Sequence, residues 1–432
     1  MPASSRDRLE QSLLKIADPA GEGARACLTV YAETARKAAD AADARRKSGV
    51  SLGPLDGAIV TVKDLFDVAG EVTRAGSRVL AARGKPASAD AVIVTKLREA
   101  GAVIVAKTNM TEFAYSGIGA NPHFGTPGNP ADRARVPGGS SAGAAVAVGD
   151  GMCEIAIGSD TGGSTRIPAA FCGVVGFKPT VKRISREGAF PLSFTLDSIG
   201  PIAHSVADCA NADAVMAGET PSPLAPLDLK GVRAGFVQGY PIEGLDATVG
   251  KSFPQALAKL APHWKSGEDI TLAALDIMHA VNERGGIAPP EAYAIHRALL
   301  KEDAEGIDPN VRLRLQRAAN VSAADYIQNM RDRERGIAQV DSLFGRFDVL
   351  VMPTVSIVAP TMDEISTPEG FTAKNISALR NTSIWNFFDV CAISLPIRLG
   401  NALPCGLMLV GRHGDDRKLL TIAAAVERQL AA

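Results

Sequence analysis

Residues 158–168, GSDTGGSTRIP, place a serine directly behind two glycines. The apolar run EIAI comes before this segment and is typical of a buried strand. The glycines permit a sharp turn that leaves backbone N–H groups uncovered, and such groups can stabilise the oxyanion of an acyl transfer. The pattern therefore makes Ser164 a candidate nucleophile. A strand followed by a serine-capped helix would give the same pattern, and no histidine lies nearby to take a proton.

Lys63 is a candidate for the missing base. It follows the run AIVTV, which predicts a buried strand. A lysine at this position could mark an exposed strand end. It could instead be desolvated, which would lower its pKa and provide a neutral amine at physiological pH. Serine and lysine then form an accepted variant of the catalytic triad.

A second serine-rich turn, PGGSSAG, covers residues 137–143. It formally matches the hydrolase elbow G-x-S-x-G, which would make Ser141 the nucleophile. The elbow requires a buried strand directly before it, and the preceding NPADRARVP is polar and broken by proline. The context favours a glycine-rich helix start capped by serine, although this does not explain two glycines followed by two serines.

The histidines are weaker candidates for a catalytic or metal-binding role than Ser164 and Lys63 are. None has a metal-ligand spacing such as H-x₃-H, and none sits in a turn with a serine. A Ser-His-Asp site could be assembled only from distant residues. We therefore predict no metal site from the histidines. The histidines are His123, His204, His263, His279, His296 and His413.

The elements that must position these residues alternate between strands and helices. This alternation predicts an α/β fold with Lys63 and Ser164 at strand ends. We expect strands at 58–62, 102–109, 153–160, 174–180, 231–237 and 347–354, helices at 90–101, 140–151, 167–173 and 203–218, and two strands with a closing helix at the C-terminal end.

No repeat and no linker divides the chain, so we predict one domain over residues 1–432. It would contain a helical N-terminal segment (1–48), a motif-bearing core (55–218), a variable helical insertion in the middle third (229–350) and C-terminal strands with a helix (351–432).

Composition excludes several classes of protein. Of 432 residues, 46% are hydrophobic and 22% charged, and the formal net charge is −1. These values are typical of a soluble globular protein and give no basis for binding nucleic acid or an anionic membrane. The N-terminal residues contain no apolar signal segment, so we expect a cytoplasmic protein.

Together the motifs resemble those of the amidase signature family. The resemblance rests on TVKDLFDVAG, GANPHFGTPGNP, PGGSSAGAAVAVGDG, GSDTGGSTRIPAAFCGVVGFKPT and SLPI followed by LPCGLMLVGR. It covers residues 55–218 nearly throughout, in order, and the C-terminal strand pair. Residues 229–350 match only loosely. The resemblance implies a mixed, twisted β-sheet covered by helices on both faces.

The resemblance also implies a Ser-Ser-Lys triad. Ser164 would be the acyl-enzyme nucleophile and Lys63 the terminal base. Ser140 would bridge them, held by a cis peptide from Gly139. The backbone N–H groups of the nucleophile and of the three residues before it would form the oxyanion hole; those three residues are Thr161, Gly162 and Gly163.

Other residues would support this site. Arg166 could clamp a substrate carboxylate or brace the loops against Asp160, and we favour bracing. Ser141 would support the triad by hydrogen bonds. The family usually has a glycine where this chain has Ala142.

Substrate specificity would lie around residues 110–123 and in the insertion. Met110 and Tyr115 are candidates for the substrate pocket. Three aromatic residues could line an acyl pocket or belong to the core, namely Phe113, Phe194 and Trp385.

The implied function is an amidase that hydrolyses a small carboxamide to a carboxylic acid and ammonia or an amine. This chemistry would need no metal and no organic cofactor. A homodimer is a reasonable expectation. One alternative is the catalytic subunit of a glutamine-dependent tRNA amidotransferase, which would hand ammonia to a partner. Another is a catalytically silent binding module on the same fold.

Overall fold

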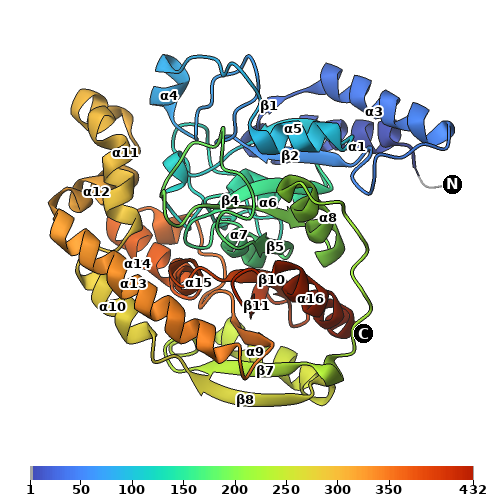
Figure 1. The fold of residues 1–432 in the computed structure, drawn as a ribbon. Coiled ribbons are helices and arrows are strands. Elements are labelled where there is room, and N and C mark those ends of the chain that lie inside the picture. Colours follow the sequence, from blue (N-terminus) through green and yellow to red (C-terminus); the bar gives the residue numbers. More distant parts are fainter. Residues whose placement is uncertain (1–2, 432) are drawn as a thin grey trace.

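The computed structural model describes residues 3–431, and one mixed sheet runs through it from end to end (Figure 1). Its strand order is β1-β3-β2-β4-β6-β5-β10-β11-β9-β7-β8. The strands are β1 (Cys27–Val30), β2 (Ile59–Lys63), β3 (Val103–Thr108), β4 (Ile155–Asp160), β5 (Val175–Lys178), β6 (Ser198–Ala203), β7 (Arg233–Gln238), β8 (Ser266–Thr271), β9 (Val349–Pro353), β10 (Cys391–Ile397) and β11 (Cys405–Gly411).

The sheet contains two parallel groups joined by antiparallel pairs. Strands β3, β2 and β4 run parallel, as do β9, β7 and β8, and the remaining neighbours are antiparallel. Because the carboxyl ends of parallel strands meet at one edge, β2 and β4 bring their last residues together. This edge holds the site described below.

Helices cover both faces of the sheet (Figure 1). They are α1 (Ser5–Ala17), α2 (Gly23–Ala26), α3 (Ala32–Lys47), α4 (Arg78–Arg83), α5 (Val92–Glu99), α6 (Ala142–Gly149), α7 (Arg166–Cys172), α8 (Val206–Ala217), α9 (Ala247–Leu260), α10 (Leu275–Glu283), α11 (Ala288–Asp303), α12 (Pro309–Arg317), α13 (Ala323–Leu343), α14 (Pro368–Leu379), α15 (Thr382–Phe387) and α16 (Asp416–Ala431).

Each strand contributes buried side chains to both faces of the sheet. Successive side chains of a strand point to opposite sides of the sheet. In β2, Val60 and Val62 join one cluster of buried side chains, and Ile59 joins another that contains residues of α1, α3 and α6. In β11, Leu407 joins the first cluster, and Met408 joins a third that contains residues of α10, α13 and α15.

The structure confirms the α/β class and adds strands that local patterns did not predict. Strand β1 lies inside the N-terminal segment that we expected to be helical, and β6 and β8 were not predicted. The middle third contains the expected helices α9 to α13 but also contributes β7 and β8 to the sheet. Within residues 3–431, no helix combines the length and apolar character required to cross a bilayer.

Candidate active site

Lys63 is the last residue of β2 and is completely buried. Strand β2 lies between β3 and β4 and runs parallel to both. The lysine side chain therefore emerges at the carboxyl edge of the sheet, close to the end of β4, which carries Ser159 and Asp160. The strand-end position of Lys63 was predicted from its sequence context, but its contact with Ser159 was not.

Three serine hydroxyls surround the Lys63 amine. Its Nζ lies 2.7 Å from Ser140 Oγ, 2.9 Å from Ser159 Oγ and 3.0 Å from Ser141 Oγ. Burial lowers the pKa of Lys63 to about 7, although Asp160 and Asp197 oppose this shift from a distance. A large fraction of the lysine is therefore neutral near physiological pH.

A neutral amine has two N–H groups and one lone pair, so three neighbours satisfy it. The Ser141 hydroxyl donates to the Ser159 carbonyl at 3.3 Å, and it therefore accepts from Lys63. If Ser159 Oγ accepts the other N–H, the lone pair points at Ser140, the nearest of the three hydroxyls. The geometry suits proton transfer from Ser140 to Lys63.

The two serines of PGGSSAG lie at the turn before α6. The peptide between Gly139 and Ser140 is cis. The Ser141 N–H donates to the Ser164 carbonyl at 3.3 Å, which joins this turn to the turn after β4. Ser141 is fully buried and lines no cavity that opens to Ser164. Its hydroxyl is used inside the lysine cluster, and no strand precedes it as a hydrolase elbow requires.

Ser164 lies in the tight turn between β4 and α7 and lines a cavity of about 220 Å³. Gly163 makes this turn possible. Its φ is +136°, a conformation that L side chains rarely adopt, and a Cβ there would lie 2.1 Å from Thr382 Oγ1. Within residues 3–431, no hydrogen bond joins the Ser164 hydroxyl to that of Ser140. Catalytic hydrogen bonds often tighten only when substrate binds.

The backbone amides of this turn divide into two groups. The Gly163 N–H donates to Asp160 Oδ1 at 2.8 Å. In contrast, the amides of Thr161, Gly162 and Ser164 donate to no acceptor in the described part of the chain. These three amides, rather than that of Gly163, are available to a developing oxyanion.

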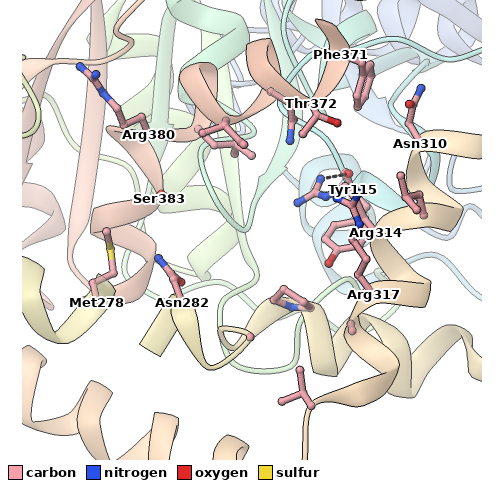
Figure 2. Close-up of a pocket in the computed structure, with 18 of the residues that line it drawn as sticks. Tyr115, Met278, Asn282, Asn310, Arg314, Arg317, Phe371, Thr372, Arg380 and Ser383 are labelled. Carbon is pink, nitrogen blue, oxygen red and sulfur yellow. Dashed lines mark hydrogen bonds between the residues drawn. The ribbon is translucent and has the colours of Figure 1, made fainter. Parts of the chain in front are cut away.

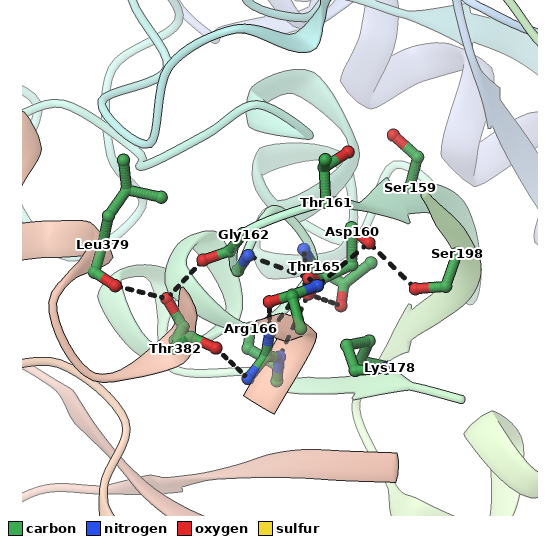
Figure 3. Close-up of polar contacts among 12 residues, drawn as sticks. Ser159, Asp160, Thr161, Gly162, Thr165, Arg166, Lys178, Ser198, Leu379 and Thr382 are labelled. Carbon is green, nitrogen blue, oxygen red and sulfur yellow. Dashed lines mark hydrogen bonds and ion pairs between the residues drawn. The ribbon is translucent and has the colours of Figure 1, made fainter. Parts of the chain in front are cut away.

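Asp160 and Arg166 form a buried pair that fixes the turn (Figure 3). Arg166 Nη2 lies 2.9 Å from Asp160 Oδ1, and Arg166 Nε lies 3.0 Å from Oδ2. Both side chains are fully buried. Arg166 also donates to the Thr382 carbonyl and to Asn386 Oδ1. The Arg166 guanidinium holds the pKa of Asp160 well below its usual range despite desolvation. Arg166 thus braces the loops, and it does not line the Ser164 cavity or the larger cavity beside it.

Another buried carboxylate holds the same turn from the other side. Asp197 accepts hydrogen bonds from Thr161 Oγ1 at 2.5 Å and from the backbone N–H groups of Leu192 and Ser193. Burial raises the pKa of Asp197. No sequence pattern indicated this contact, because Asp197 lies outside every motif and reaches Thr161 only through the fold.

The candidate pocket residues lie at different depths. Tyr115 lines the Ser164 cavity and a larger neighbouring one. Met110 is fully buried and lines neither of them. Phe113 is buried against His296, with the ring centroids 4.0 Å apart, and Trp385 is buried beside Met352. Phe194 is 58% exposed and lines a separate cavity next to Thr161.

The fold and the site define a class of protein. A buried, partly neutral lysine contacts the serines of one turn, that turn is bonded to a second turn carrying Ser164, and Ser164 faces a cavity. No group of three His, Cys, Asp or Glu side chains placed to hold a metal occurs in residues 3–431. Such a site is suited to acyl transfer by a serine nucleophile.

Comparison with known proteins identifies the family. The Amidase family model matches residues 9–420, so the chain belongs to this family and is an amide-hydrolysing enzyme. A solved amidase structure superimposes with a TM-score of 0.87 at 35% identity, covering 99% of this chain and 96% of the amidase.

Two relatives indicate the range of activities in the family. The 2-amino-5-chloromuconic acid deaminase of Comamonas testosteroni is 37% identical over 91% of this chain and 86% of its own length. A glutamyl-tRNA(Gln) amidotransferase subunit from Anaeromyxobacter dehalogenans is 36% identical over 99% of this chain and 93% of its own length.

Proposed function

We propose that the enzyme hydrolyses the C–N bond of a small carboxamide through an acyl-enzyme on Ser164, with Ser140 and Lys63 as the proton relay. One observation carries this proposal. Lys63 is buried without an ion-pair partner in residues 3–431, its pKa is lowered to about 7, and its amine lies 2.7 Å from Ser140 Oγ. A lysine in this environment can act as a neutral base.

The relay moves two protons as the nucleophile attacks. The Lys63 lone pair takes the proton of Ser140, and Ser140 takes the proton of Ser164. The Ser164 oxygen then bonds to the amide carbon. The relay returns a proton to the nitrogen as the C–N bond breaks, which releases ammonia or an amine. Water next attacks the ester carbonyl and passes a proton to the relay. The relay returns this proton to the Ser164 oxygen as the ester bond breaks, which releases the carboxylic acid and the free enzyme.

The oxyanion formed in both steps requires hydrogen-bond donors. The amides of Thr161, Gly162 and Ser164 are the donors that we propose, because the Gly163 amide already bonds to Asp160. Each key donor of this kind contributes about 3–4 kcal/mol in comparable enzymes. We propose that Asp160, Arg166 and Asp197 position these amides without contacting the substrate.

Release of ammonia or amine from a panel of amides tests the proposal. The panel should include aliphatic, aromatic, urea-type and dicarboxylic amides. We expect the wild type to hydrolyse at least one class, and we expect Ser164→Ala to lose that activity on the order of 10⁴-fold or more. Ser185→Ala, at an exposed serine outside the site, should leave it unchanged. Undiminished hydrolysis by Ser164→Ala would refute the proposed nucleophile.

The second candidate function is that of an amidotransferase subunit. The relative from Anaeromyxobacter dehalogenans supports it, since the similarity extends over 99% of this chain. This function predicts glutaminase activity that appears only when partner subunits are present. Amide hydrolysis by the isolated chain, unchanged by those subunits, favours the free-standing amidase.

A further inference from the structure

A larger cavity, whose lining residues are drawn in Figure 2, lies next to the cavity lined by Ser164. The inner cavity has a volume of about 220 Å³ and the outer one about 500 Å³. They are contiguous because the same side chains line both, among them Tyr115, Asn282, Arg314 and Leu379. A substrate whose amide reaches Ser164 can therefore extend into the outer cavity.

The arginines and carboxylates around the two cavities are unevenly represented, so that the combined cleft is positively charged. Its lining includes Arg314, Arg317 and Arg380 but no aspartate or glutamate. None of these arginines has an ion-pair partner in residues 3–431. Arg312 of the same helix shows the contrast, because it pairs with Glu305. The cleft thus presents positive charge that the protein itself does not neutralise.

Arg314 is the arginine that lines both cavities. Its guanidinium stacks 4.0 Å from the centroid of the Tyr115 ring and donates one hydrogen bond to the Tyr115 carbonyl. Its other N–H groups donate to no acceptor in the described chain. Burial lowers the pKa of Arg314 from its ordinary value, but arginine stays charged. A partly desolvated guanidinium with free N–H groups is a good partner for a carboxylate.

Arg380 lies on the opposite side of the outer cavity from Arg314 (Figure 2). Its side-chain hydrogen bonds in the described part of the chain are two long ones of 3.4 Å, to Asn381 Oδ1 and the Pro241 carbonyl. Its guanidinium also lies 5.4 Å from the Tyr240 ring centroid. These contacts hold the side chain at the wall without satisfying its charge.

We propose that the enzyme takes monoamides of dicarboxylic acids and that Arg314 binds the free carboxylate, with Arg380 approaching from the opposite wall. This inference rests on the proposed function of Ser164. The apolar side chains of Phe371 and Leu379 line the outer cavity and would contact the carbon chain between the two ends. Arg317, which is exposed at the outer cavity, would attract the anion.

Matched substrates test this proposal. We would measure kcat/KM for adipamate and hexanamide, and for glutaramate and pentanamide, which differ in one carboxylate at equal chain length. The wild type should prefer the acid of each pair by about tenfold or more, since a hydrogen-bonded ion pair contributes on that scale. The preference should fall as ionic strength rises, because salt screens the attraction.

Equal or faster hydrolysis of the neutral amides would overturn this inference and leave the proposed function standing. Failure to hydrolyse any amide of the wider panel would instead refute the proposed function.

Variants separate carboxylate binding from a structural role. Arg314→Gln should lower the acid-to-neutral ratio of kcat/KM by about 10- to 100-fold, and Arg380→Gln should lower it less. Arg331→Gln, at an exposed arginine that lines neither cavity, should leave the ratio unchanged. Equal losses toward both substrates in Arg314→Gln would show that the residue only supports Tyr115. If that variant does not fold, Arg380→Gln decides, and an unchanged ratio there overturns the proposal.

Discussion

Two buried lysines at neighbouring strands show how local contacts decide the chemistry of an amine. Burial lowers the pKa of Lys107 of β3, but the Asp64 carboxylate, which lies 3.6 Å from the amine, opposes this shift. Among residues 3–431, Lys63 of β2 has only serine hydroxyls at hydrogen-bond distance. Burial therefore acts on Lys63 with little opposition. Of these two residues, Lys63 is the one suited to accept a proton near neutral pH.

The rate of hydrolysis should follow the protonation state of Lys63. A base must be deprotonated to act, and the pKa of Lys63 is lowered to about 7. We therefore expect kcat/KM to rise with pH through about 7 and to level off above it, without a fall on the alkaline side up to about pH 9. Lys63→Ala should reduce kcat/KM by about 10²- to 10⁴-fold or more, and its profile should lose this rise. If kcat/KM of Lys63→Ala still rose with pH and with the same midpoint, the titrating group would be one other than Lys63.

At the scale of elements, the turn from β4 to α7 depends on a buried ion pair. Asp160 binds the N–H groups of Gly163 and Thr165, and Arg166 binds Asp160 and the Thr382 carbonyl of α15. The pair thus joins the strand, the turn and a distant helix. Removing one partner leaves an uncompensated charge in the core, which is costly.

Arg166→Met should therefore destabilise the protein by about 3–5 kcal/mol. The measurement is the free energy of unfolding in urea. Asp160→Asn combined with Arg166→Met should recover part of the loss, because no charge then remains unpaired. Arg417→Met, at an exposed arginine, is the control. Wild-type stability in Arg166→Met, together with a selective loss of activity toward anionic amides, would mean that Arg166 contacts substrate instead.

The elements around the site could be predicted because their sequences carry strong local patterns. Strands β2, β3 and β4 are apolar runs, and α8 lies between Ser205 and Gly218, two residue types that favour helix caps. The missed strands lack such patterns. β8, SGEDIT, is an exposed edge strand with one buried residue, and β6 contains Gly200 and Pro201. Their strand conformation comes from pairing with β7, β4 and β5, which no local pattern encodes.

At the scale of the whole molecule, the sheet connects all parts of the chain. The N-terminal segment adds β1 at one edge, and the middle third adds β8 at the other. The C-terminal strands β10 and β11 lie inside the sheet between β5 and β9, and α16 packs against α8, α9 and β10. No segment within residues 3–431 has a sheet of its own, so we expect the chain to unfold as one unit.

The two tryptophans can test this cooperativity. Trp264 lies near the β8 edge and Trp385 lies in the core beside Met352. The variants Trp264→Phe and Trp385→Phe each keep one tryptophan, whose fluorescence reports on its surroundings. After correction for the change in stability, the two variants should unfold in urea with the same midpoint. Both fluorescence transitions should coincide with the transition seen by far-UV circular dichroism. A separate, earlier transition at Trp264 would show that the middle third unfolds on its own.

The candidate site was predictable only where motifs carry it. Lys63, Ser140 and Ser164 stand in motifs that each left a structural alternative open, and only the combination of these motifs resembled one family. Arg314 and Arg380 have no motif around them, and they face one cavity only because α12 and the segment between α14 and α15 meet across it. Side chains brought together from distant parts of the chain in this way become visible only in the folded structure.

Covalent labelling tests the central proposal most directly. A fluorophosphonate probe should react with the wild type at one site, which peptide mapping should locate at Ser164. Ser164→Ala should not be labelled, and Lys63→Ala should be labelled far more slowly, because its serine has lost the base. An adduct on Ser141, or labelling of Lys63→Ala at the wild-type rate, would contradict the proposed nucleophile and relay.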